Sequence, residues 1–63
     1  DPATLITIYG DAQLFLNSFF GGESRGRCIQ FTVTNSRGTS FTQFNKQAIS
    51  EIAATLNEWL KDN

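Results

Sequence analysis

The chain has 63 residues and a mass of 7.0 kDa, which is enough for a single domain over residues 1–63 and too little for two. It contains one cysteine and no histidine, so neither an internal disulfide nor an ordinary zinc site can support its small core. The net charge of −1 argues against general affinity for nucleic acid, and no apolar run approaches the length of a membrane helix. A lone cysteine is typical of a reducing compartment, so we expect a cytoplasmic protein with no membrane contact.

The composition is poor in charge and rich in aromatic side chains. Charged residues make up 17% of the chain, below the usual share of about 25%, and aromatic residues make up 13%. Protein interfaces are enriched in aromatic residues and depleted of charges. Because domains this small commonly need a second subunit for stability, the composition predicts a homo-oligomer, most simply a homodimer.

The first predicted element is a strand over residues 5–9, where β-branched and aromatic residues precede the turn residues Gly10 and Asp11. Residues 11–20 allow two interpretations. Apolar residues at helical spacing favour a helix that is capped by Asp11 and stopped by Gly21, and this interpretation is preferred. In the alternative, Gly10 and Asp11 form a hairpin turn and residues 13–20 form a second strand.

Residues 21–26 contain three glycines and are expected to form a loop. Together with Arg27 and Cys28 they match the glycine spacing of a phosphate-binding loop. The two residues of that loop that contact phosphate and magnesium are absent here. Arg27 replaces the lysine, and Cys28 replaces the hydroxyl residue that holds magnesium. The following residues also alternate like a strand, whereas that loop precedes a helix. We therefore expect no bound nucleotide and no other cofactor.

The clearest strand begins at residue 27 and alternates strictly, with three apolar residues on one face: Ile29, Phe31 and Val33. Residues 35–38 fit a type I turn closed by glycine, which sets Asn35 opposite Thr39 in the following strand. This register places Phe41 opposite Val33 on the apolar face. The other face then carries polar side chains, from Gln30, Thr32, Thr34, Ser40 and Thr42.

The C-terminal segment is predicted to be a helix, because apolar residues recur at helical spacing: Ile49, Ile52, Ala53, Leu56 and Leu60. Asn45 is the expected N-cap. Phe44 just before the cap and Ile49 four residues after it form a predicted hydrophobic staple, which sets the angle between the last strand and the helix. These elements predict an α+β fold: an antiparallel sheet of three or four strands with the C-terminal helix packed on one face, in the order β, then helix or β, then β, β, α.

The usual groups for catalysis are missing from this sequence. There is no histidine, and Cys28 has only Arg27 beside it as a charged neighbour. The six carboxylates are isolated from one another and are expected to be solvated. We therefore expect a non-enzymatic protein without a metal, in which Cys28 is a small filler on a half-exposed strand face.

Two sets of residues are predicted to form binding surfaces. The apolar and aromatic set is assigned to self-association: Leu14, Leu16, Phe19, Phe20 and Trp59. The polar set, on the hairpin and its flanks, is assigned to a partner: Arg25, Arg27, Gln30, Thr32, Arg37 and Thr42. The expected partner is a larger cellular protein, towards which this chain acts as an accessory or inhibitory protein.

The alternative function is a sheet-based nucleic-acid binder that uses the same polar hairpin face, where hydroxyl and amide groups suit bases and phosphates. Nucleic acid is the less expected partner, because such sheets normally come with a strongly positive surface. In its small size, missing catalytic residues and strand, hairpin, helix order, the chain resembles small phage accessory proteins.

Overall fold

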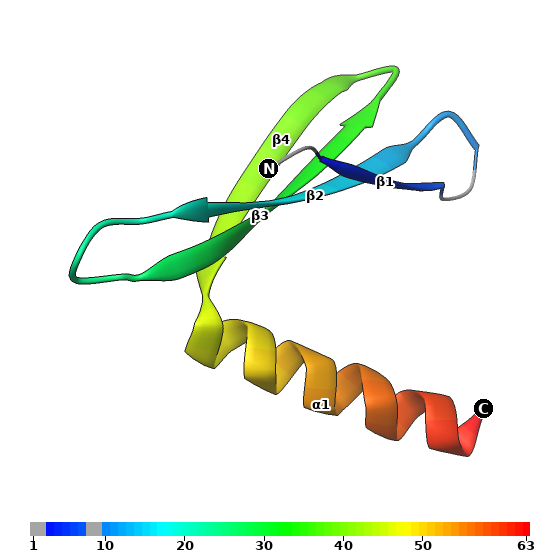
Figure 1. Ribbon diagram of the computed structural model, residues 1–63. Helices are drawn as coiled ribbons and strands as arrows, with labels where there is room; N and C mark the ends of the chain where they lie inside the picture. Colours follow the sequence, from blue (N-terminus) through cyan, green and yellow to red (C-terminus); the bar gives the residue numbers. More distant parts are fainter. Residues whose placement is uncertain (1–2, 8–9) are drawn as a thin grey trace.

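Four antiparallel strands followed by one helix make up the structure, a computed structural model that describes residues 3–7 and 10–63 (Figure 1). The elements, in chain order, are β1 (Thr4–Thr7), β2 (Gln13–Phe20), β3 (Arg27–Asn35), β4 (Gly38–Asn45) and α1 (Lys46–Asp62). The strands form one sheet in the order β1-β2-β3-β4, so each strand pairs with its neighbour in the sequence. The predicted α+β class, with an antiparallel sheet followed by a C-terminal helix, is confirmed.

Residues 11–20 form a turn and a strand, so the preferred helix interpretation is wrong and its alternative is correct. β2 pairs with β1 on one edge and with β3 on the other. Backbone pairing on both edges outweighs the helical spacing of a short apolar run. Asp11 therefore caps no helix and lies in the β1–β2 turn, where Gly10 takes a positive φ of 71°. Of the predicted strand over residues 5–9, residues 8 and 9 lie outside the described part of the chain.

The β3–β4 hairpin has a tighter turn than the sequence predicts. Asn35 pairs with Gly38 and not with Thr39, which leaves two residues in the turn. The backbone N–H of Arg37 donates to Oδ1 of Asn35 at 2.8 Å, and Gly38 takes a φ of 137°, which favours glycine. A change of one residue in register moves every β4 side chain to the other face. Phe41 accordingly pairs with Thr32 and lies on the polar side of the hairpin. The prediction of which β4 side chains lie on the apolar face and which on the polar face is therefore wrong.

The strand registers divide the sheet into two faces, because directly paired residues point to the same side. We call one the apolar face, since most of its side chains are apolar: Ile6, Leu14, Leu16, Phe20, Ile29, Phe31, Val33 and Phe44, with Thr4, Ser18, Arg27, Ser40 and Thr42 between them. We call the other the polar face: Leu5, Thr7, Gln13, Phe15, Asn17, Phe19, Cys28, Gln30, Thr32, Thr34, Thr39, Phe41, Gln43 and Asn45.

The helix α1 begins at the predicted N-cap. Asn45 has an extended backbone, and the N–H of Ala48 donates to its side-chain Oδ1 at 2.9 Å. Among the described residues α1 contacts β3 and β4 but neither β1 nor β2, and Figure 1 shows it leaving the sheet after its first turns. The staple between Phe44 and Ile49 stays a prediction. No helix in the described part of the chain has the length and apolar character needed to cross a membrane.

Very little of the chain is buried. Cys28, at 3% exposure, is the one buried apolar residue among those described, and α1 has no buried residue. On the apolar face Phe31 and Phe44 make an edge-to-face contact, with ring centroids 5.1 Å apart and planes at 72°. Apolar side chains therefore contact one another on the apolar face, but the single chain does not bury them.

The two turns at one end of the sheet are tied together by Asp11. The backbone N–H of Ser36, in the β3–β4 turn, donates to Oδ2 of Asp11 at 2.8 Å. Hydrogen bonds from the Ser36 side chain and then from its backbone lower the pKa of the Asp11 carboxyl below its ordinary value of 3.8.

A depressed pKa in the folded state means that the charged carboxylate stabilises the fold above the unfolded pKa and that this contribution is lost as pH falls through the folded pKa. We expect the Asp11 side-chain carbon to titrate below 3.8 in an NMR pH series. In Asp11→Asn, the decrease in the free energy of unfolding at low pH that is due to the Asp11 carboxylate should be absent. A carboxyl that titrates at or above 3.8 would contradict the contact with Ser36.

Candidate functional site

The polar face is built in rows that run across the strands. Following the registers, the first row holds hydroxyls and an amide, from Thr7, Gln13, Thr34 and Thr39. The second, which we call the aromatic row, holds Leu5, Phe15, Thr32 and Phe41. The third, the amide row, holds Asn17, Gln30 and Gln43, and the fourth holds Phe19, Cys28 and Asn45. Aromatic rings therefore alternate with hydrogen-bonding side chains across this face.

The amide row is ordered by hydrogen bonds between its own members and their neighbours. Nε2 of Gln43 donates to Oε1 of Gln30 at 3.0 Å, and Nε2 of Gln30 donates to Oγ1 of Thr32 at 3.0 Å. Nη1 of Arg25 donates to Oε1 of Gln43 at 3.1 Å. The network runs from the β2–β3 loop to the aromatic row, so it sets the direction in which each glutamine amide points.

Arg25 places a positive charge at the edge of the polar face. Its guanidinium carbon lies 5.7 Å from the centroid of the Phe19 ring, within the range of a cation–π contact. Its Nε donates to the carbonyl oxygen of Gly21 at 3.2 Å, which ties the side chain to the loop. Arg25 therefore belongs to the same surface as Phe19 and Gln43.

The loop between β2 and β3 closes tightly over Cys28. The N–H of Gly21 donates to the oxygen of Gly26, and the N–H of Gly26 donates to the oxygen of Gly22, each at 2.7 Å. The Sγ of Cys28 lies 3.6 Å from the carbonyl oxygen of Gly26. The expected half-exposed filler is in fact buried, because the loop folds back over this end of the polar face.

Gly21 is a position where even a methyl group should not fit. A Cβ there would lie 2.8 Å from Sγ of Cys28 and 3.1 Å from Cβ of Arg25. We expect Gly21→Ala to lower the free energy of unfolding by about 1–3 kcal/mol, measured by urea denaturation. Adding Cys28→Ala should restore part of that loss, since the closest clashing atom is gone; strictly additive effects of the two changes would contradict this packing.

The structure brings together three of the six residues predicted to bind a partner. Gln30 and Thr32 lie on the polar face, with Arg25 at its edge. Thr42 lies on the apolar face because of the shifted register. Arg27 also lies there, where its Nη2 donates to Oγ of Ser18 at 3.0 Å, and Arg37 lies in the turn at the opposite end of the hairpin.

The residues predicted for self-association do not lie on one surface, because β2 is a strand. Leu14, Leu16 and Phe20 share the apolar face, and Phe20 is 63% exposed. Phe19 points to the polar face, because neighbouring residues of a strand alternate in direction. Trp59 lies on α1 and is 60% exposed.

Sequence reasoning missed residues on both surfaces. Phe15, Phe41 and Gln43 belong to the polar face, and the strand alternation of residues 13–20 is the signal that would have placed Phe15 there. On α1, Leu56 and Leu60 were expected to pack on the sheet but are 56% and 62% exposed. They extend the apolar surface beyond the sheet.

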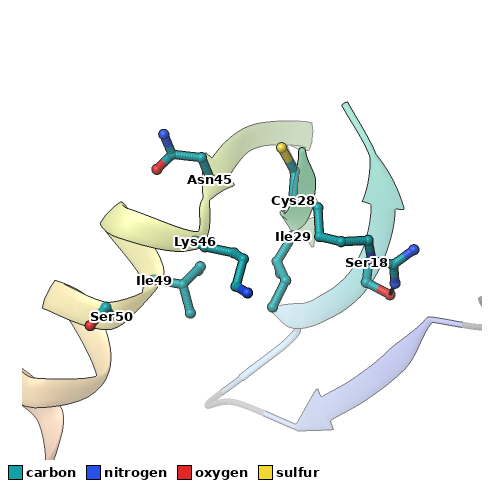
Figure 2. A pocket seen from close by; sticks show the side chains of 8 residues that line it. Ser18, Cys28, Ile29, Asn45, Lys46, Ile49 and Ser50 are labelled. Atoms are coloured by element: carbon teal, nitrogen blue, oxygen red, sulfur yellow. Dashed lines mark hydrogen bonds between the residues drawn. The ribbon is translucent and has the colours of Figure 1, made fainter. Parts of the chain in front are cut away.

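A hollow of about 390 Å³ lies where α1 leaves the sheet, and Figure 2 shows Ile29 of the sheet and Ile49 of α1 on its two sides, with Lys46 between them. Its lining is Ser18, Arg27, Cys28, Ile29, Asn45, Lys46, Ile49 and Ser50. In the described part of the chain no group of three or more cysteine and carboxylate residues is placed to hold a metal. The hollow continues the apolar face towards α1, so we treat it as part of that surface.

Comparisons with protein-family models, with curated proteins and with solved structures find no match to this chain. The fold and surfaces define a class in structural terms: a small α+β protein with a four-stranded antiparallel sheet and one C-terminal helix. Its sheet has an apolar face that α1 covers only in part and a polar face with ordered rows of rings and amides.

Proposed function

We propose that this protein is a non-enzymatic binding module that works as a homodimer. The observation that carries the proposal is its surface area. The chain exposes 5061 Å², whereas a folded monomer of this mass should expose about 4,000 Å². The excess of about 1,000 Å² is similar to the roughly 800 Å² that each partner buries in a standard protein interface.

The shape of the chain supports the same proposal. Its radius of gyration is 13.3 Å, whereas a compact domain of this length should have about 11 Å. The difference arises because α1 extends away from the sheet instead of lying along it (Figure 1). A 63-residue domain in which α1 contacts only β3 and β4 among the described strands gives up much of the burial on which its stability depends.

The uncovered area is apolar and lies on two adjoining elements. The apolar stripe of α1 includes Leu56, Trp59 and Leu60, each more than half exposed. The apolar face of the sheet adds Phe20 and Ile6, at 63% and 39% exposure. A second copy brings an identical stripe and face, and a two-fold interface would bury these surfaces on both chains at once.

A non-enzymatic role fits the side chains present. The chain has no histidine, Cys28 is buried under a loop, and the hollow beside α1 lies on the surface that the dimer covers. The proposed role is that of a small cytoplasmic accessory or inhibitory protein.

The polar face stays open in this dimer, and two classes of partner fit it. A larger cellular protein is the first, because interfaces are rich in aromatic residues. Nucleic acid is the second, and one observation favours it: the two-residue turn brings Phe41 into the same row as Phe15, beside the amide row.

The test of the dimer is the absolute mass in solution, measured by light scattering on a sizing column over a wide range of concentrations. We expect twice the chain mass of 7.0 kDa, persisting on dilution. A mass of one chain at every concentration would contradict the proposal.

A further inference from the structure

We infer that the polar face binds single-stranded nucleic acid, with bases stacked on Phe15, Phe19 and Phe41 and base edges held by the amide row. The inference rests on the proposed function in one respect, because a dimer formed through α1 and the apolar face leaves the polar face open.

The three rings are spaced as separate stacking positions. Phe15 and Phe41 lie in one row on strands two apart, which places them about 10 Å from one another. Phe19 lies four residues further along β2, about 13 Å from Phe15. Phe41 is 63% exposed, and Phe15 and Phe19 are half-buried. Unpaired bases stack on such rings with little regard to sequence.

The amide row supplies hydrogen bonds between the stacking positions. A carboxamide offers donors and an acceptor in one plane, which matches the edges of bases. The bonds from Gln43 to Gln30 and from Gln30 to Thr32 hold these amides in fixed directions. Base edges are open for such contacts in a single strand, whereas they are paired in a duplex.

The described strands of the sheet carry no carboxylate that would repel a phosphate, while Asp11 and Glu23 lie in the turns at its two ends. Arg27 is the one charged residue in the four strands as described, so the polar face has no carboxylate on its described strand positions. Arg25 stands beside Phe19 at one end of the face, and Arg37 lies in the turn at the other end. The remaining carboxylates of the described residues lie in the turns and on α1.

The same features disfavour duplex nucleic acid and a protein partner. Binding to a duplex depends on many phosphate contacts, and two arginines at opposite ends of the face supply few. The centre of a protein interface is a continuous desolvated apolar patch. Here the amide row separates Phe19 from the aromatic row, so the apolar area is divided.

The test measures fluorescence anisotropy of labelled oligonucleotides of about 12 nucleotides. Single-stranded DNA, single-stranded RNA and a DNA duplex are compared at low salt. Phe15→Ala and Phe41→Ala should each weaken single-strand binding by about 10-fold or more. Phe41→Leu keeps an apolar side chain but removes the ring and should weaken it as well. Gln47→Ala, at an exposed position on the side of α1 opposite Leu56, is the control and should bind like the unchanged protein.

Solution mass and circular dichroism of every variant separate the two proposals. Binding of single strands but not of the duplex, lost in the phenylalanine variants while the mass stays that of a dimer, supports the inference. Binding by a monomer would support it and overturn the dimer. A dimer that binds neither single-stranded DNA nor single-stranded RNA overturns the inference and leaves a protein as the partner of the polar face. A dimer that binds the duplex as well as it binds single strands also overturns the inference.

Discussion

Leu56→Glu is expected to convert the dimer into a monomer at concentrations where the unchanged protein stays dimeric. Leu56 belongs to the apolar stripe of α1 and is 56% exposed in the single chain. In the dimer the change would forfeit about 1.5–3 kcal/mol of leucine burial and place an unpaired carboxylate in an apolar interface. We expect the dissociation constant to rise at least about 100-fold, measured by light scattering over a dilution series.

Ala54→Glu is the matched control for this change. Residue 54 precedes Leu56 by two positions, which places it about 200° around the helix and on the opposite side. Both variants add the same charge to the same helix, but the Ala54 variant should remain a dimer. Equal dissociation of the two variants would show that the stripe of α1 is not the interface.

Phe31→Ala is expected to lower the free energy of unfolding by about 3 kcal/mol. Phe31 lies on the apolar face in an edge-to-face contact with Phe44, at 5.1 Å between centroids. Truncation removes that contact and leaves a void on the apolar face, which the proposed dimer would cover. Urea unfolding at equal protein concentrations measures the change, since the stability of a dimer depends on concentration.

Phe41→Ala should change the free energy of unfolding by no more than about 0.5 kcal/mol. Phe41 is 63% exposed and pairs with Thr32 on the polar face. In the register predicted from the sequence, Phe41 would pair with Val33 and lie in the core beside Phe31. Equal losses in the two phenylalanine variants would therefore favour the predicted register over the observed one.

Elements with strong local signals were predictable from the sequence. The helix after Asn45 follows from an apolar stripe and a capping side chain, and both are confirmed. The strand from residue 27 follows from strict alternation, and the glycines of residues 21–26 form the expected loop. The overall α+β class followed from these elements together.

For residues 11–20 the local sequence pattern does not distinguish a helix from a strand. Their apolar residues fit a helix face as well as a strand, and the pairing of β2 between β1 and β3 decides for the strand. That outcome separates Phe19 from Phe20 and so splits the predicted self-association cluster between two faces. Of the residues on the polar face and its edge, Gln30, Thr32 and Arg25 were assigned to a partner from the sequence, whereas Phe15, Phe41 and Gln43 were not, and the binding role of all of them stays a prediction.

The sequence by itself determined the class of the fold, the helix with its cap, the hairpin of β3 and β4, and a surplus of aromatic side chains. Only the tertiary structure decided that residues 13–20 are a strand, that Phe41 joins the polar face, and that α1 contacts β3 and β4 but leaves β1 and β2 uncovered. The physical reason is that helix signals arise between residues a few positions apart, whereas strand pairing joins distant residues. With a side-chain period of two, a turn that differs by one residue moves a whole strand to the other face.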